Sequence, residues 1–207
     1  PNLVNVVARS ATFTVDLRDP LKPMEMGLLQ LPGVQYDAEL LGGKLYLAGA
    51  WGGVSELSHE DPLEPALLRT IETTGWAMAL AAAGNELLVL DGADGAMLYE
   101  IGGEAAAPLS TFTRGGFVAT GVTNGKTAFL LDEEYGLMAV DYASKAAPKL
   151  VSRWMPLTEA RRVTVSGTTA YVAGGLSGMH VIDLGGIGNP REAFWYNTDG
   201  GYVNNVL

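Results

Sequence analysis

Cysteine is absent from the 207-residue sequence, and basic residues are few. The lack of cysteine excludes disulfide bonds, thiolate metal ligands and cysteine nucleophiles. Thirteen lysines and arginines stand against 23 acidic residues, which gives a net charge of −10, and the basic residues form no stripe. Because such a chain is poorly matched to a phosphate backbone, we expect no nucleic-acid partner.

Long hydrophobic runs and helical periodicity are also missing. The longest apolar run, Trp76–Ala83, stops at Gly84. It is much shorter than the ~20 residues that span a bilayer, so we expect no membrane insertion. No stretch has the period of an amphipathic helix. Pro1 opens the chain without a methionine, and we therefore expect a segment excised from a longer protein.

What the sequence does contain is a repeat of about 42 residues. The segment GMHVIDL (178–184) resembles GLMAVDY (136–142), and three further copies begin at Ala11, Gly53 and Gly95. The sixth residues of the five copies are separated by 42, 42, 41 and 42 positions. A proline follows each copy: Pro23, Pro65, Pro108, Pro148 and Pro190. Markers that stay in phase over the whole chain indicate a repeat architecture.

Each repeat has the pattern of four short strands. In residues 162–196 the order is RVTV, a turn, AYVA, a turn, MHVID, a linker and EAFWY. These segments alternate and are rich in valine and aromatic residues, as strands are. Gly167 and Gly178 stand where hairpin turns need a positive φ. Four strands in about 40 residues is the blade of a propeller. The sequence predicts an all-β fold, a five-bladed β-propeller with four-stranded antiparallel blades.

The two ends of the chain predict how the ring closes. Residues 3–17 align with residues 170–184, and residues 202–207 match the start of a first strand. We therefore expect a single domain, residues 1–207, whose ring is closed by N- and C-terminal strands that share one blade. The predicted blades are 202–207 with 1–30, then 31–73, 74–114, 115–156 and 157–201. The shared blade lacks about three positions, so a longer array of more blades is the alternative.

The segment AYVAGGLSGMHVIDLGGIGNP (170–190) carries the repeat consensus most clearly. It resembles the LVIVD repeat, a family of predicted prokaryotic β-propellers that are often exported or on the cell surface. The resemblance covers all five units and is also clear in FLLDEEYGLMAVDY (129–142). It implies a propeller fold and an extracellular, cell-surface or periplasmic location. The family has no established catalytic residues, so none can be carried over to this chain.

Five carboxylates fall in equivalent loops of two neighbouring units, on one predicted face. They are Asp91, Asp94, Asp132, Glu133 and Glu134. Such a group could coordinate Ca²⁺, which takes 6–8 oxygen ligands, although neither loop has the spacing of a known calcium loop. The alternative is that Asp91 and Asp132 stabilise tight turns while the others are solvated. Apart from this candidate Ca²⁺, we expect no cofactor.

Further candidate residues lie on the predicted channel and on the same loop face. Asp37 and Glu39 stand two apart on one first strand, where like charges repel instead of dividing acid and base roles as a glycosidase requires. The alternative is a channel partly plugged by side chains, in which Arg161 or Arg162 pairs with Asp37. Trp51 and Tyr135, in the loops, could stack on a sugar or anchor a protein, or they could cover the rim between blades. The full predicted ligand-binding face is Trp51, Tyr135, Asp37, Glu39, Arg161 and Arg162.

The strands repeat along the chain, whereas the loops between them diverge. The loops read ARSA, AWGG, GADG, EEYG and GLSG. This favours a scaffold with one composite surface over a set of identical ligand sites. We expect neither histidine to have a serine and an acid as partners in a triad. We therefore expect a non-enzymatic scaffold that binds a protein or cell-surface ligand. A hydrolase or lyase acting at the channel mouth is the alternative, and the oligomeric state stays open.

Overall fold

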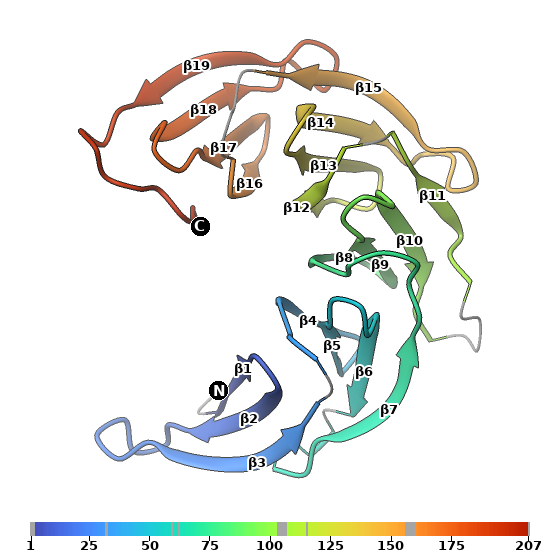
Figure 1. Ribbon diagram of the computed structural model, residues 1–207, viewed down its shortest axis with the longest axis vertical. Coiled ribbons are helices and arrows are strands. Elements are labelled where there is room, and N and C mark those ends of the chain that lie inside the picture. Colours follow the sequence, from blue (N-terminus) through green and yellow to red (C-terminus); the bar gives the residue numbers. More distant parts are fainter. Residues whose placement is uncertain are drawn as a thin grey trace.

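The computed structural model describes residues 3–31, 33–58, 60–61, 63–102, 107–114, 116–155 and 160–206. Within these ranges the chain forms strands and no helix. The strands make five antiparallel sheets that follow one another around an open arc (Figure 1). The all-β prediction is confirmed, and the five successive sheets are arranged like the blades of a propeller.

The sheets are numbered one to five in chain order. Sheet one has three strands, β1 (Leu3–Ala8), β2 (Ala11–Asp16) and β3 (Met24–Gln30). Each of the other sheets has four strands, which run in chain order from the inner to the outer side of the arc. These strands are β4 (Asp37–Leu41), β5 (Lys44–Ala48), β6 (Val54–Ser58), β7 (Ala66–Ile71), β8 (Ala79–Ala83), β9 (Glu86–Leu90), β10 (Ala96–Glu100), β11 (Ser110–Phe112), β12 (Val118–Thr123), β13 (Thr127–Asp132), β14 (Gly136–Asp141), β15 (Lys149–Trp154), β16 (Arg162–Ser166), β17 (Thr169–Ala173), β18 (Met179–Asp183) and β19 (Arg191–Tyr196).

Sheets two, three and four have a neighbouring sheet on each side, and their central strands are accordingly apolar. β13 (TAFLLD) is buried along its whole length, because a neighbouring sheet covers each of its faces. The outermost strands alternate or are exposed instead, as in β15 and β19. Four sheets have a register shift between their last two strands, for example between Ala139 and Val140. Such irregularities increase the local twist of a sheet.

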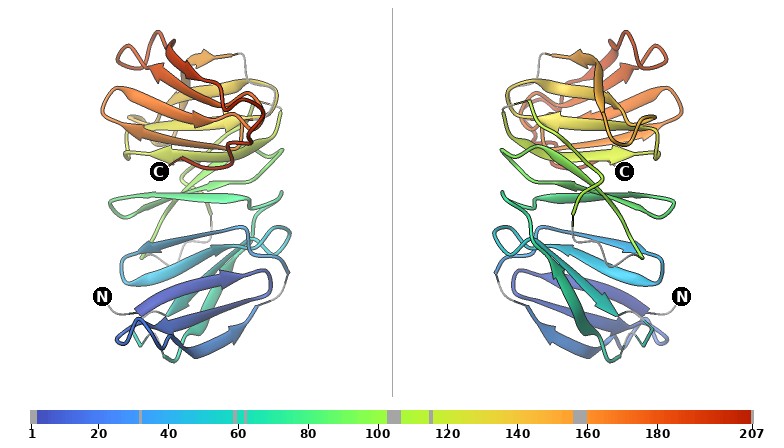
Figure 2. Two further views of the ribbon diagram at one scale, coloured as in Figure 1. Left: turned by 90° about the vertical axis from the view of Figure 1, so that its left-hand side faces the viewer. Right: turned by 90° about the vertical axis from the view of Figure 1, so that its right-hand side faces the viewer.

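Buried apolar side chains form a separate cluster at each of the four interfaces between successive sheets. Between sheets three and four the cluster includes Leu88, Leu90, Leu130 and Met138, all with 0% exposure. The other clusters lie between sheets one and two, two and three, and four and five. Each sheet thus packs on its neighbours in the sequence, as the side views also show (Figure 2). This is the nearest-neighbour packing of repeat proteins.

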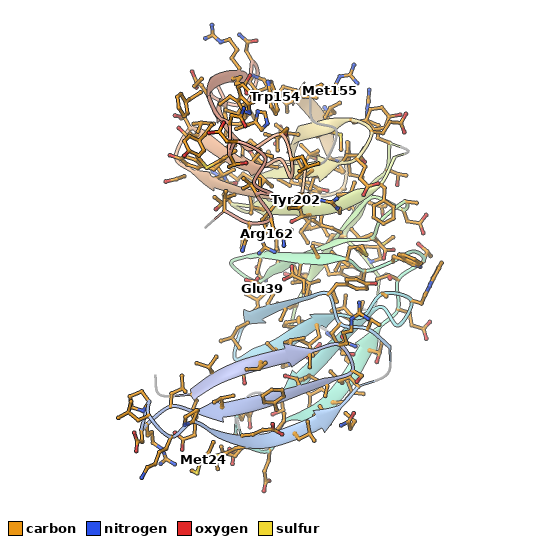
Figure 3. All side chains as sticks on the ribbon, turned by 60° about the vertical axis from the view of Figure 1, so that its left-hand side comes forward. Met24, Glu39, Trp154, Met155, Arg162 and Tyr202 are labelled. Carbon is orange, nitrogen blue, oxygen red and sulfur yellow. The ribbon has the colours of Figure 1, made fainter. Side chains whose placement is uncertain are left out.

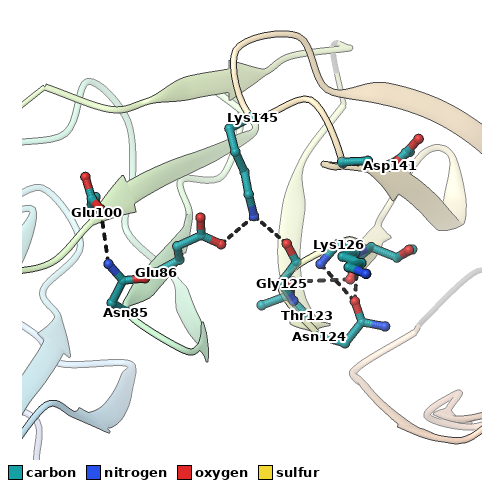
Figure 4. Close-up of polar contacts among 11 residues, drawn as sticks. Asn85, Glu86, Glu100, Thr123, Asn124, Gly125, Lys126, Asp141 and Lys145 are labelled. Carbon is teal, nitrogen blue, oxygen red and sulfur yellow. Dashed lines mark hydrogen bonds and ion pairs between the residues drawn. The ribbon is translucent and has the colours of Figure 1, made fainter.

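A lysine joins sheets three and four away from their apolar cluster. The Lys145 Nζ donates to Glu86 Oε2 at 2.5 Å and to the Gly125 carbonyl (Figure 4). The Gly125 turn is itself ordered by Asn124, whose Oδ1 accepts the amide of Thr127 at 2.8 Å. Lys145 is 35% exposed, and pairs of this kind contribute about 0–1 kcal/mol. The bridge therefore orients the two hairpins more than it stabilises them.

The shared blade predicted from the two chain ends is not formed in the structure. β1 has no inner neighbour among the described residues. Residues 197–206 curve back toward the inner side of sheet five (Figure 1), where Val203 and Gly175 exchange backbone hydrogen bonds of 2.9 and 3.0 Å. Ala77 makes the same paired contact with Ala50, two residues before β8 begins. Val203 therefore stands where an inner strand begins, while closure of the ring stays a prediction.

Gly95 provides a test of the sheet packing. A Cβ on Gly95 would lie 2.2 Å from the Phe112 carbonyl oxygen, and its φ is +89°. Gly84 has a φ of +65° but nothing within 4 Å of a Cβ. We expect Gly95→Ala to lower the free energy of unfolding by about 2–4 kcal/mol and Gly84→Ala by about 1 kcal/mol. Urea unfolding of both variants measures the difference, and equal losses would contradict the steric argument.

Candidate functional site

The loops between the second and third strands of sheets two to five lie on one face of the arc, here called the loop face. These loops are residues 49–53, 91–95, 132–136 and 174–178. The residue at the middle of each loop is Trp51, Ala93, Glu134 or Leu176. The backbone scaffold therefore repeats, but the side chain that it presents changes from sheet to sheet.

Three aromatic side chains gather on the loop face over sheets two to four. Trp51 is 73% exposed and meets Trp76 edge-to-face, with ring centroids 4.9 Å apart and planes at 86°. Together with Phe117 they line a pocket of about 320 Å³. Gly92 lies between Phe117 and Trp76, since a Cβ there would be 3.0 Å from Phe117 Cε2 and 3.5 Å from Trp76 Cβ. We call these three residues the aromatic pocket.

The charges around the aromatic pocket are acidic. Asp94 lines it, and a second pocket of similar volume shares Asp94 and Thr74 and adds Glu72 and Tyr99. Among the described residues that line these two pockets, none is a lysine or arginine. Aromatic faces together with a carboxylate attract cations. The arrangement is thus suited to a positively charged group.

Asp91 holds the backbone that carries the pocket. It is completely buried, and its Oδ2 accepts the Gly75 amide at 2.8 Å. Burial raises the pKa of Asp91 above its ordinary value, while the Thr73 hydroxyl and nearby backbone amides lower it in part. Because Gly75 directly precedes Trp76, the Asp91 carboxylate anchors the backbone from which the indole extends.

The five carboxylates proposed for Ca²⁺ have different roles in the structure. Asp91 is bound to Gly75, and Asp132 Oδ1 accepts the amides of Glu134 and Tyr135, both at 2.8 Å. The contacts of Asp132 match the alternative interpretation, in which the two aspartates stabilise turns, whereas Asp91 binds the segment before β8 instead of its own loop. Glu133 and Glu134 are exposed, and Asp94 lies in the pocket wall. In the part of the chain that the structure describes, no group of three or more acidic or histidine side chains is placed to hold a metal ion.

The predicted ligand-binding residues fall into two separate groups. Trp51 and Tyr135 are on the loop face, where the Arg114 guanidinium lies 5.5 Å from the Tyr135 ring centroid. The predicted channel residues Asp37, Glu39, Arg161 and Arg162 come from β4 and from β16 with the residue before it. Asp37 Oδ2 accepts the Leu80 amide at 3.0 Å and so joins sheets two and three.

Glu39 and Arg162 face the inner side of the arc from sheets two and five (Figure 3). Burial raises the pKa of Glu39, the Asp37 carboxylate raises it further, and the positive charge of Arg162 lowers it. Arg162 therefore acts electrostatically on Glu39 across the arc. Arg161 instead stacks over Tyr202, with its guanidinium 5.7 Å from the ring centroid.

The sequence-based statement that His180 has no serine and acid partner is wrong; His59 lies outside the described residues. His180 Nε2 is 3.0 Å from Ser177 Oγ, and its Nδ1 is 2.6 Å from Glu192 Oε1. Glu192 comes from β19, opposite Ile182 of β18, so strand pairing brings it to the histidine. The series of contacts Ser177–His180–Glu192 has the order of a serine–histidine–acid triad.

The surroundings of Ser177, His180 and Glu192 indicate that His180 packs in the protein interior. His180 is 7% exposed between Trp154 and Trp195, at centroid distances of 5.6 and 6.3 Å. Ser177 Oγ also lies 2.6 Å from the Gly174 carbonyl, to which it donates. The amides of Gly174, Gly175, Ser177 and Gly178 are all bound to backbone carbonyls, so they do not form an oxyanion hole.

Comparison with known proteins finds no matching family model and no similar curated protein. The fold does match solved structures. The crystal structure of the computationally designed Ika8 protein superposes with a TM-score of 0.76 at 11% sequence identity. The match covers 98% of this chain and 61% of the designed chain. At this identity the similarity shows the fold alone.

No helix in the described residues is long and apolar enough to cross a membrane.

His180 allows the packing interpretation to be tested. Equivalent positions of sheets three and four hold Met97 and Met138. We expect His180→Met to change the free energy of unfolding by less than about 1 kcal/mol, and His180→Ala to lower it by about 2–3 kcal/mol because it leaves a cavity. Urea unfolding at pH 7 measures both. A large loss in His180→Met would show that the hydrogen-bond chain, not the filled volume, stabilises this site.

Proposed function

We propose that the chain is a non-enzymatic binding scaffold that takes a basic segment of a protein ligand in the aromatic pocket. The observation that carries the proposal is Trp51, a large side chain held 73% exposed at the mouth of an acidic, aromatic-walled pocket. An extracellular, cell-surface or periplasmic location belongs to the same proposal and rests on the LVIVD resemblance.

The backbone beneath Trp51 supports a functional role. Ala50 has a φ of +50°, whereas glycine occupies the equivalent places in sheets three and five, at Gly92 and Gly175. A side chain in this conformation costs about 1–2 kcal/mol. Backbone strain of this kind concentrates at functional sites, where the surroundings hold it in place. The loop thus keeps an unfavourable conformation that positions the adjacent tryptophan.

The charge of the protein supports a cationic ligand. Asp94 and Glu72 line the two adjoining pockets, and the chain as a whole carries a net charge of −10. The electrostatic field of this negative charge attracts basic partners and raises their association rate. A guanidinium or ammonium group between Trp51, Trp76 and Phe117 would gain cation–π contacts, each contributing about 0.5–2 kcal/mol.

A tetra-arginine peptide tests the proposal by calorimetric titration. We expect saturable binding that Trp51→Ala weakens by about tenfold or more, because the pocket loses one wall. Leu176→Ala is the matched control, since Leu176 is 61% exposed at the same loop position of sheet five, and it should bind as the unmodified chain does. Equal affinities of the two variants would remove the pocket as the binding site.

A hydrolase is the second candidate function, and the Ser177–His180–Glu192 chain favours it. In that case His180 would take the Ser177 proton as the hydroxyl attacks an ester carbonyl. We expect no reaction with a fluorophosphonate probe, because the Ser177 hydroxyl donates to Gly174 and the loop lacks an oxyanion hole. Stoichiometric labelling that Ser177→Ala abolishes, seen by intact-mass spectrometry, would contradict the scaffold proposal.

The proposal extends to the architecture. We infer that sheet one is completed by an inner strand of the type that begins at Val203, so that an N-terminal and a C-terminal strand share a blade, within one ring or between two copies. The paired hydrogen bonds of Val203 with Gly175, which repeat those of Ala77 with Ala50, support this. The inner edge of β1, which has no strand beside it among the described residues, supports it as well, since an unpaired strand edge favours strand addition.

A further inference from the structure

The outer face of sheet five has the composition of an interface between blades. Tyr171, Val181 and Phe194 are aligned across β17, β18 and β19, as are Ala173, Met179 and Tyr196. The equivalent residues of sheet four face sheet five and are buried: Phe129, Leu131, Leu137, Ala139 and Trp154, none more than 7% exposed. Tyr196, by contrast, is 55% exposed, although it matches Trp154 in register. We call this surface the front face.

Sheet one presents the complementary surface on its opposite side. Val4 pairs with Val15, and Val6 with Phe13, on one face of β1 and β2. Val4 is 44% exposed, and the other three are partly exposed. Their counterparts on the side of sheet five that packs on sheet four are Ala170, Val172, His180 and Ile182, which are at most 7% exposed. We call the four residues of sheet one the back face.

Front faces and back faces are the two partners of every interface in this molecule. The front face of sheet four packs on the back of sheet five, and the same relation holds at the earlier interfaces. The repeat therefore makes the exposed front face complementary to the exposed back face, in shape and in apolar character. Exposed apolar surfaces of this kind mark interaction sites.

The C-terminal segment extends in the matching register. Because Val203 corresponds to Ala77, Asn205 corresponds to Ala79, which pairs with Leu90 of β9. Val7 of β1 occupies the position of Leu90, because Val7 pairs with Thr12 of β2 as Leu90 pairs with Ala96 of β10. An inner strand added to β1 would thus place Asn205 opposite Val7.

The two faces do not meet within one chain. Sheets one and five lie at opposite ends of an open arc (Figure 1). The same arrangement of five sheets matches 61% of the designed chain, so a chain built of such units would have room for about three more. At this spacing between sheets, five of them do not complete a turn.

We propose that the front face and the C-terminal segment of one chain dock on sheet one of a second copy. In this head-to-tail contact, Tyr171, Val181 and Tyr196 cover Val4, Phe13 and Val15, while residues 202–206 add to β1 as its inner strand. The contact is heterologous, with different surfaces on the two copies, and it can extend to further copies. It is independent of the aromatic pocket, which lies over sheets two to four.

Cross-linking between two different variants tests the register. The chain has no cysteine, so Val7→Cys and Asn205→Cys each introduce a single thiol. A short bis-maleimide should cross-link a mixture of the two variants to a dimer, and neither variant alone should yield it. In the double variant, a cross-link within one chain together with no dimer in the mixture would show closure in cis and overturn the proposal.

Association without cysteines gives a second measurement. We expect the mass from light scattering to rise with concentration, and Tyr196→Lys to raise the dissociation constant by about tenfold or more. Leu68→Lys is the control, because Leu68 is 50% exposed on β7 of sheet two, which belongs to neither face, and it should associate like the unmodified chain. A constant monomer mass, or equal weakening by both variants, would overturn the proposal.

Discussion

The face-to-face packing of neighbouring sheets is the interaction on which the rest of the structure depends. A single sheet of this chain has two apolar faces, and each face needs a neighbour to exclude water. Sheets two, three and four have both neighbours, and strands such as β13 are buried throughout. The glycine at Gly95 and its counterparts permits the close approach of outer strand and hairpin that this stacking requires. The loops, which take no part in the stacking, are free to differ.

The repeat of about 42 residues was sufficient to predict the fold class, because hairpin glycines and alternating strands are local features. The curvature of the arc was not predictable in this way. It depends on the angle at which one sheet packs on the next, which is set by side-chain volumes across an interface such as Trp154 against Ile182. Closure of the ring depends on that angle summed over all the interfaces, and the spacing of residues along the chain does not determine it.

The candidate site was predicted in part. Trp51 was identified as a ligand-binding residue because exposed loops with divergent sequences carry function, whereas Asp94 was identified as a Ca²⁺ ligand. Their association with Trp76 and Phe117 was missed, since these residues stand just before inner strands, about 25 and 66 positions after Trp51 along the chain. Glu192 reaches His180 only through the register shift between β18 and β19, an irregularity that no local pattern reveals. For Asp91 and Asp132 the sequence allowed both a Ca²⁺ site and the stabilisation of turns. In the structure, backbone amides donate hydrogen bonds to both carboxylates.

The four interface clusters share no residue with one another. An evolutionary consequence follows for the gene. Duplication or deletion of one 42-residue unit by unequal recombination would add or remove a whole sheet together with one interface, and the remaining clusters would keep their contacts. Blade number in such a lineage can therefore change in single genetic events, while the aromatic pocket, which spans three adjacent units, is inherited only if those three stay together.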